Sequence, residues 1–117
     1  MVRLIIAGGR YFNDYTLLKD RLDYFLSEVD EPIEIVSGKA SGADTLGERY
    51  ARENGYPVKE FYAQWNQHGK KAGYLRNKDM AEYATHCVCF WDNESKGTQH
   101  MIQLTKEYNL PIRVIKY

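Results

Sequence analysis

The chain has 117 residues, and its 16 Lys and Arg residues balance 16 Asp and Glu residues, so the formal net charge at pH 7 is zero. This length suits one domain, residues 1–117, and the balanced charge excludes a strong overall field that would attract DNA or an anionic membrane. The longest apolar run, residues 87–91, is short, and no signal-peptide pattern opens the chain, so we expect a cytoplasmic protein without membrane contacts.

Strand and helix patterns alternate along the chain. Apolar runs rich in branched side chains predict strands at 2–7, 33–38, 57–62, 86–91 and 111–117. Apolar positions three and four residues apart predict helices between them, with inward faces in 18–29, 43–51, 77–84 and 101–108. This order predicts a Rossmann-like α/β fold in three layers, with a five-stranded parallel sheet between helices.

The turns that follow the strands are the candidate site. In a parallel sheet every strand-to-helix turn lies at the same edge, so we expect residues 8–10, 37–44, 63–73 and 91–98 to gather there. The segment 63–73 is also longer than a simple connection requires, which makes it a candidate functional loop.

The second of these turns, SGKASGAD from Ser37 to Asp44, has features that suit an anion. Gly38 and Gly42 let the backbone approach a phosphate, the helix that follows begins with free N–H groups, and Lys39 lies nearby. The spacing does not match a Walker A loop. Ser41 and Asp44 also satisfy the Ser-x-x-Asp capping-box pattern, so the alternative is that both only cap the helix.

The first turn contains two glycines and an arginine. Gly8 and Gly9 form either a tight turn or a contact with a ligand. Arg10 follows them at the edge where helix N-termini converge, and a guanidinium there suits bidentate binding of phosphate or carboxylate. A surface salt bridge is the alternative for Arg10.

Two helix starts add further candidates. Gly97 and Thr98 open the last helix as a second phosphate cradle, to which Thr98 or Ser95 offers a hydroxyl. Arg76 and Asn77 open the third helix, and Asn77 lies on its inward face, where a buried amide needs a polar partner. Asn77 therefore either contacts a ligand or fixes a loop through an internal hydrogen bond.

Aromatic residues are plentiful near the same edge. We expect some to belong to the wall or the core and others to offer a stacking surface for a base; they are Tyr11, Phe12, Trp65, Tyr74 and Trp91.

The two cysteines point to core packing rather than to a metal site or a disulfide. Cys87 and Cys89 share one face of a predicted strand, and no second pair of Cys or His residues stands at ligand spacing.

The four turns together resemble one known family. GGR, SGKASGAD, HGKKAGYLRNKDM and WDNESKGTQHM follow the four strands in an order similar to that of the DUF2493 or YspA (cpYpsA-related) family of the SLOG superfamily. The resemblance spans nearly the whole chain. It implies a sheet in the order 3-2-1-4-5, with the first and fourth turns beside each other.

The resemblance implies a class of function without choosing the ligand. Relatives include cytokinin-activating phosphoribohydrolases, DNA-processing protein A, and sensor domains for nucleotide-derived signals in bacterial and phage conflict. The hydrolases carry PGGxGTxxE; here Gly97 and Thr98 match its GT, whereas Glu94 and Ser95 replace its glycines. Met101 occupies the position of the catalytic glutamate in that motif, and a methionine cannot act as an acid or a base.

We therefore expect binding, for sensing or sequestration, of a phosphate-bearing nucleotide derivative such as an ADP-ribose or cyclic-nucleotide signal. Arg10, Arg76 and two helix N-termini would hold phosphate, while Asp44 and Asn77 would meet ribose hydroxyls or fix the loops. No cofactor is required, and a homo-oligomer is compatible with the sequence.

Two other functions remain open. Hydrolysis of an N-glycosidic bond in a nucleotide is the first alternative, with Asp44 and Glu94 as the carboxylates placed to serve. Binding of single-stranded nucleic acid is the second, and the zero net charge disfavours it.

Overall fold

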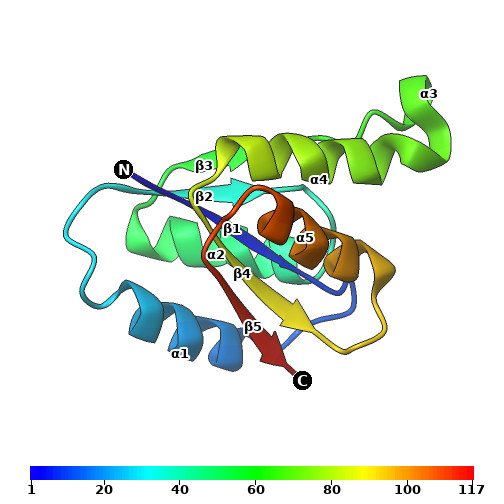
Figure 1. Ribbon diagram of the computed structural model, residues 1–117. Coiled ribbons are helices and arrows are strands. Elements are labelled where there is room, and N and C mark those ends of the chain that lie inside the picture. The colour runs from blue at the N-terminus through cyan, green and yellow to red at the C-terminus, as the bar shows by residue number, and fades with distance from the viewer.

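The computed structural model describes residues 1–117 and contains one parallel sheet with its strands in the order β3-β2-β1-β4-β5. The strands are β1 (Val2–Gly8), β2 (Ile33–Ser37), β3 (Val58–Glu60), β4 (His86–Trp91) and β5 (Ile112–Lys116). β1 lies at the centre, paired with β2 and β4, as its apolar, branched side chains predict. The predicted α/β fold and the strand order are both confirmed (Figure 1).

Helices cover both faces of the sheet (Figure 1). They are α1 (Tyr15–Leu26), α2 (Ala43–Asn54), α3 (Trp65–His68), α4 (Ala72–Tyr83) and α5 (Lys96–Glu107), with a 3-10 turn at Gly69–Lys71. α1 and α2 pack with Leu4 and Ile6 of β1, whereas α4 and α5 pack with Ile5 and Ala7, because successive side chains of a strand point to opposite faces. A bilayer crossing would need a longer and more apolar helix than any of these.

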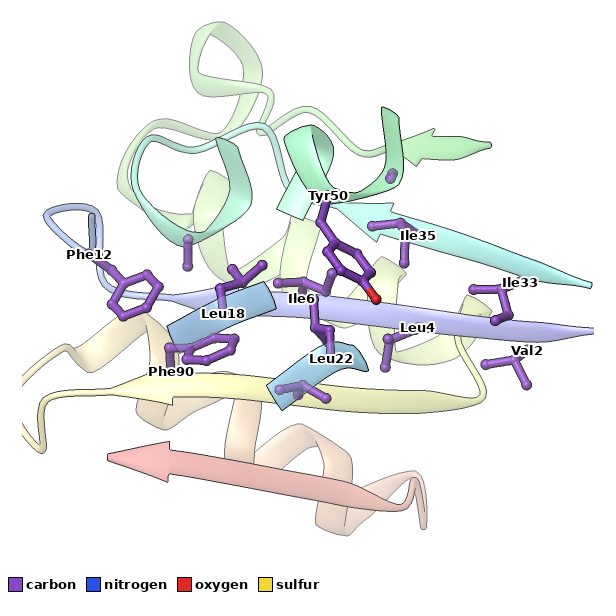
Figure 2. Packing of buried hydrophobic residues seen from close by; sticks show 13 residues of the cluster. Val2, Leu4, Ile6, Phe12, Leu18, Leu22, Ile33, Ile35, Tyr50 and Phe90 are labelled. Atoms are coloured by element: carbon purple, nitrogen blue, oxygen red, sulfur yellow. The ribbon is translucent and has the colours of Figure 1, made fainter. Parts of the chain in front are cut away.

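The larger core lies between the sheet and the pair α1 and α2. Figure 2 shows Tyr50 of α2 lying over the sheet near Ile35, and Phe12 next to Phe90, whose ring centroid is 4.9 Å away. The hydroxyl of Tyr50 donates a hydrogen bond to Asp23 Oδ1 at 2.7 Å, so the polar end of this buried ring is satisfied.

The smaller core, between the sheet and the pair α4 and α5, holds both cysteines. Cys87 and Cys89 are buried on one face of β4 as free thiols, with their Sγ atoms 3.6 Å apart. Met80 and Met101 pack in the same cluster. The prediction that the cysteines pack in the core is confirmed.

Several predicted boundaries are wrong. β3 has three residues instead of the predicted 57–62, because its partner β2 ends at Ser37, which lies opposite Glu60. The segment 63–73 is not an open loop, since it contains α3 and the 3-10 turn. α1 ends before residue 29 and α5 before residue 108, although both patterns reach those positions.

The turn after β2 meets the turn after β1 through Gly42. This residue has a left-handed φ of +77°, and a Cβ atom there would lie 2.2 Å from the carbonyl oxygen of Gly9. The same oxygen accepts a hydrogen bond from the Ala43 N–H at 3.3 Å. Only glycine suits both the conformation and the contact, so the two turns are held against each other.

Replacing Gly42 with alanine should lower the free energy of unfolding by more than about 3 kcal/mol, because a backbone clash adds to a left-handed penalty of about 1 to 2 kcal/mol. Gly55→Ala is the control for a positive φ without a clash, since Gly55 has a φ of +72° and an added Cβ would meet no atom within 4 Å; its ψ of 21° differs from the −124° of Gly42, which adds to the loss expected at Gly42. Urea denaturation of both variants measures the difference. Equal losses would show that the contact with Gly9 carries no constraint.

Candidate functional site

A cleft opens at the carboxyl edge of the sheet, where residues from all four predicted turns meet. Its wider part, the upper hollow, has a volume of about 510 Å³ and lies between the turn after β2, α3 and the start of α4. Its narrower part, the lower hollow, has a volume of about 130 Å³ and reaches the end of β1. Both hollows are lined by Arg10, Ala40, Arg76, Asn77 and Gly97.

Arg10 brings an unpaired positive charge to the cleft. Its side chain is exposed, and none of the seven ion pairs of the molecule includes it. The surface salt bridge considered as its alternative role is therefore not formed. All the N–H donors of this guanidinium remain available to an anion.

Arg76 is partly committed to the turn after β2. Its Nη1 donates a hydrogen bond to the Gly38 carbonyl oxygen at 2.7 Å, and its Nε donates to Asn77 Oδ1 at 3.3 Å. Burial lowers the pKa of Arg76, and the negative charge of Asp44 acts in the opposite direction. The remaining N–H groups of the guanidinium make no protein hydrogen bond, so Arg76 supports the turn and keeps donors for a ligand.

Asp44 supports the same turn from the other side. It is 7% exposed, and its Oδ2 accepts a hydrogen bond from the Ala40 N–H at 3.1 Å. Burial raises the pKa of Asp44 to about 6, although the Ala40 N–H and the charge of Arg76 act to lower it. The carboxyl also lines the lower hollow, so it supports the loop and borders the space for a ligand.

The Ser-x-x-Asp pattern does not form a capping box, so that interpretation is wrong. A box would place Ser41 at the N-cap, but the N-cap of α2 is Gly42, which makes no side-chain capping hydrogen bond. The helix begins one residue later than the pattern requires. The Ser41 hydroxyl instead donates to the carbonyl oxygen of Arg10 at 3.3 Å.

Asn77 connects α4 to the start of α5. Its Nδ2 donates a hydrogen bond to the Gly97 carbonyl oxygen at 3.4 Å and lies 3.3 Å from Nδ1 of His100. Burial lowers the pKa of His100, which favours the neutral ring with Nδ1 as an acceptor. Asn77 therefore makes the internal hydrogen bond that the sequence suggested, and it also lines both hollows.

The start of α5 leaves one open backbone position in the cleft. Ser95 Oγ accepts a hydrogen bond from the Thr98 N–H at 3.4 Å and lies 3.0 Å from Thr98 Oγ1, and both residues line the lower hollow. The N–H of Gly97 makes no protein hydrogen bond, and a Cβ there would meet no atom within 4 Å. A phosphate can approach the backbone at this point.

Ser37 lies outside the cleft, contrary to its predicted place in the site. It is 1% exposed, and its hydroxyl donates a hydrogen bond to Glu48 Oε2 at 2.6 Å. Lys39 forms ion pairs of 2.9 Å with Glu48 and Glu60, which raise its pKa. This network connects the turn to α2 and β3, and it explains why neither side chain is free for a ligand.

Some of the predicted glycines line the cleft, and the others pack in the turns behind it. Gly8, Gly38 and Gly97 line a hollow, whereas Gly9 and Gly42 do not. A Cβ at Gly8 would lie 2.6 Å from a β4 carbonyl oxygen, and one at Gly9 would lie 2.5 Å from a tyrosine hydroxyl. The tight-turn interpretation of this pair is therefore supported by packing.

Three exposed aromatic residues form the rim of the upper hollow. Tyr62 and Trp65 are each 58% exposed and Tyr74 is 49% exposed, and all three line the hollow together with Lys70. Tyr62 was not among the predicted aromatics, because the sequence placed it in the third strand, which ends earlier. We call Tyr62, Trp65 and Tyr74 the aromatic rim.

The other predicted aromatics lie elsewhere. Phe12 belongs to the larger core, and the Trp91 indole N–H donates a hydrogen bond to the Ser95 carbonyl oxygen at 3.2 Å. Tyr11 is exposed but lines neither hollow. None of these three residues therefore lines the cleft.

The raised pKa of Asp44 predicts a pH-dependent difference in stability. Its pKa is about 6 in the fold and about 3.8 as the ordinary value, so the folded protein binds more protons between these values and ionisation destabilises it as the pH rises. Relative to Asp44→Asn, which cannot ionise, the unchanged protein should lose about 2 to 3 kcal/mol of unfolding free energy between pH 4 and pH 7.5. Urea denaturation of both proteins at both pH values measures this. A difference that does not change with pH would contradict the assignment.

Comparison with known proteins confirms the family that the sequence resembles. The family model described as YspA, cpYpsA-related SLOG family matches residues 2–68. The chain is 36% identical over 118 residues to the Gene 61 protein of Mycobacterium phage D29, across 96% of this chain and 94% of that protein.

A solved structure shares the fold. DNA processing protein A from Helicobacter pylori, described for its single-stranded DNA binding mode, matches 97% of this chain with a TM-score of 0.73 and 18% identity. The chain spans 64% of that structure, and the likeness concerns the fold alone. On the match to the family model and to the phage protein, this chain belongs to the YspA, cpYpsA-related SLOG family.

Proposed function

We propose that this protein binds a phosphate-bearing nucleotide derivative in the cleft, for sensing or sequestration rather than for catalysis. The observation that carries the proposal is the unpaired guanidinium of Arg10, which lines both hollows together with the open backbone of Gly97. An arginine beside a helix N-terminus suits the charge and the geometry of a phosphate group.

The charge of the cleft differs from that of the whole chain. Arg10, Lys70 and Arg76 line it, whereas Asp44 is its single carboxylate. Lys39 also lines the upper hollow, but its charge is balanced by two glutamates. A chain with no net charge therefore still has a local surplus of positive charge that attracts an anion.

The aromatic rim suits the base of a nucleotide. Its three side chains are exposed beside the cations of the upper hollow. Stacking of a base on an aromatic ring contributes about 1 to 3 kcal/mol. A ligand that combines an anionic phosphate with a planar base matches both kinds of lining.

The arrangement favours binding over hydrolysis of an N-glycosidic bond. Met101 lines the lower hollow, at the position where the similar hydrolase motif has its glutamate. Glu94 is exposed and lines neither hollow. Asp44 remains, and one of its oxygens is bonded to the Ala40 N–H. The cleft thus lacks the second acid–base group that a hydrolase of this kind would use.

Single-stranded nucleic acid is the second candidate ligand, and the exposed rim favours it. Proteins that hold single strands combine cations that follow the backbone with aromatic rings on which bases stack. DNA processing protein A, which shares the fold, binds single-stranded DNA. The local cations supply the basic patch that the composition does not, so the zero net charge no longer weighs against this ligand.

A thermal-shift panel tests the proposal. Binding to the native state at a hundredfold excess over Kd adds about 2.7 kcal/mol, which raises the Tm of a domain of this size by roughly 10 °C. We expect at least one compound among ADP-ribose, NAD, cyclic dinucleotides and nucleoside monophosphates to raise the Tm, and its unphosphorylated nucleoside to leave it unchanged. The proposal would be refuted if no phosphorylated compound raised the Tm at millimolar concentration, or if the nucleosides raised it equally.

Arg10→Ala should raise the Kd of that ligand about tenfold or more, which corresponds to the loss of a charge-assisted hydrogen bond of about 1.5 kcal/mol. The fold should be unaffected, because the guanidinium makes no protein hydrogen bond. Arg52→Ala is the control, since Arg52 is an exposed, unpaired arginine at the far end of α2. Calorimetry that gives both variants the same affinity would show that Arg10 does not hold the ligand.

Gly97→Val should weaken binding without unfolding the protein. The added side chain meets no protein atom within 4 Å of its Cβ, so it extends into the space that a phosphate would occupy. Gly97→Ala should have a smaller effect, because its side chain is shorter. Circular dichroism checks the fold, and calorimetry checks the affinity. A folded valine variant that binds as tightly as the unchanged protein would show that this turn does not cradle phosphate.

A further inference from the structure

A third hollow lies beyond Tyr74. It has a volume of about 440 Å³ and is lined by Tyr74, Lys96, Gln99, His100 and Gln103. We call it the side hollow. Tyr74 also lines the upper hollow, so this residue borders both spaces.

Three of the residues that line the side hollow have polar side chains without a protein partner. Lys96, Gln99 and Gln103 are exposed, and none of their side chains makes an ion pair or a hydrogen bond. They lie on one side of α5, because residues three, four and seven apart share a helix face. An ammonium and two amides that face an open space suit a ligand with phosphate and base-edge groups.

Tyr74 is exposed, but its ring is supported. His100 contacts it edge-on, with the ring centroids 4.6 Å apart. His100 in turn lies within hydrogen-bond distance of the buried amide of Asn77. The ring is therefore oriented before a ligand arrives, which lowers the entropic cost of stacking on it.

We infer that the ligand holds two nucleotide units joined through phosphate, one in the upper hollow and one in the side hollow, on either side of Tyr74. This inference rests on the proposed function. Arg10 would hold the phosphate of the first unit, and Lys96, next to Gly97 in the chain, would hold the phosphate that leads to the second. A short stretch of single-stranded nucleic acid and a free dinucleotide share this chemistry.

Calorimetry with nucleotides of increasing length tests the inference. The probes are the four nucleoside 5′-monophosphates and the matching linear dinucleotides pApA, pCpC, pGpG and pTpT. For at least one base we expect the dinucleotide to bind at least tenfold more tightly than its monophosphate. Lys96→Ala should remove most of that gain and change the Kd of the monophosphate less than twofold. Lys106→Ala, an exposed and unpaired lysine at the other end of α5, should change neither.

The outcomes separate this inference from the proposed function. Dinucleotides that bind no more tightly than a binding monophosphate, or a gain that Lys96→Ala leaves intact, would overturn the second site and leave the first. Failure of every monophosphate and dinucleotide to bind at millimolar concentration would overturn this inference, and the proposed function falls with it only if the whole thermal-shift panel also fails to bind. A decamer of the preferred base and the matching cyclic dinucleotide then distinguish the sources: tighter binding of the decamer indicates a strand, and tighter binding of the cyclic compound indicates a free dinucleotide.

Discussion

The shape of the cleft depends on the turn after β2, whose backbone at Gly38 passes between two charged side chains. A Cβ there would lie 3.0 Å from Asp44 Oδ2 and 3.1 Å from Arg76 Nε, so the turn after β2 runs between a carboxylate and a guanidinium. Hydrogen bonds from Arg76 and to Asp44 hold it in that place. Gly42, further along the same turn, packs against the turn after β1 and so positions Arg10. One packed loop thus sets the shape of the cleft and the position of Arg10.

Ion pairing, rather than the number of charged residues, decides which positive charges are free in the cleft. Lys39, the lysine that the sequence places in an anion-binding loop, is neutralised by carboxylates from α2 and β3. Arg10 and Lys70, in less conspicuous positions, stay unpaired and line the upper hollow. Burial raises the pKa of Asp44 to about 6, so this carboxyl loses its negative charge only below that pH, and at neutral pH the cations of the cleft outnumber it. The result is a positive cleft in a chain whose charges cancel.

The sequence predicts the framework because its signals are local and strong. Apolar runs rich in branched side chains predict the strands and the edge at which the turns gather, and the resemblance to the family implies the order of the strands. Side-chain partners depend on residues far along the chain, so they cannot be predicted this way: Ser37 bonds to Glu48, and Ser41 bonds back to Arg10. Tyr62 was missed because the length of β3 is set by where its neighbour β2 ends. α3 has four residues, too few for a periodic pattern.

The most direct test of the account is a nuclear magnetic resonance titration of the uniformly ¹⁵N-labelled protein with each phosphorylated compound of the thermal-shift panel. Binding in the cleft should shift the backbone amides of residues 38–40 and Gly97, together with the indole N–H of Trp65, because these groups surround the proposed phosphate and base. A different hollow of about 210 Å³, mostly apolar, is lined by Val2, Phe25 and other residues away from these turns. Shifts confined to that hollow, or no shifts at millimolar nucleotide, would contradict the account.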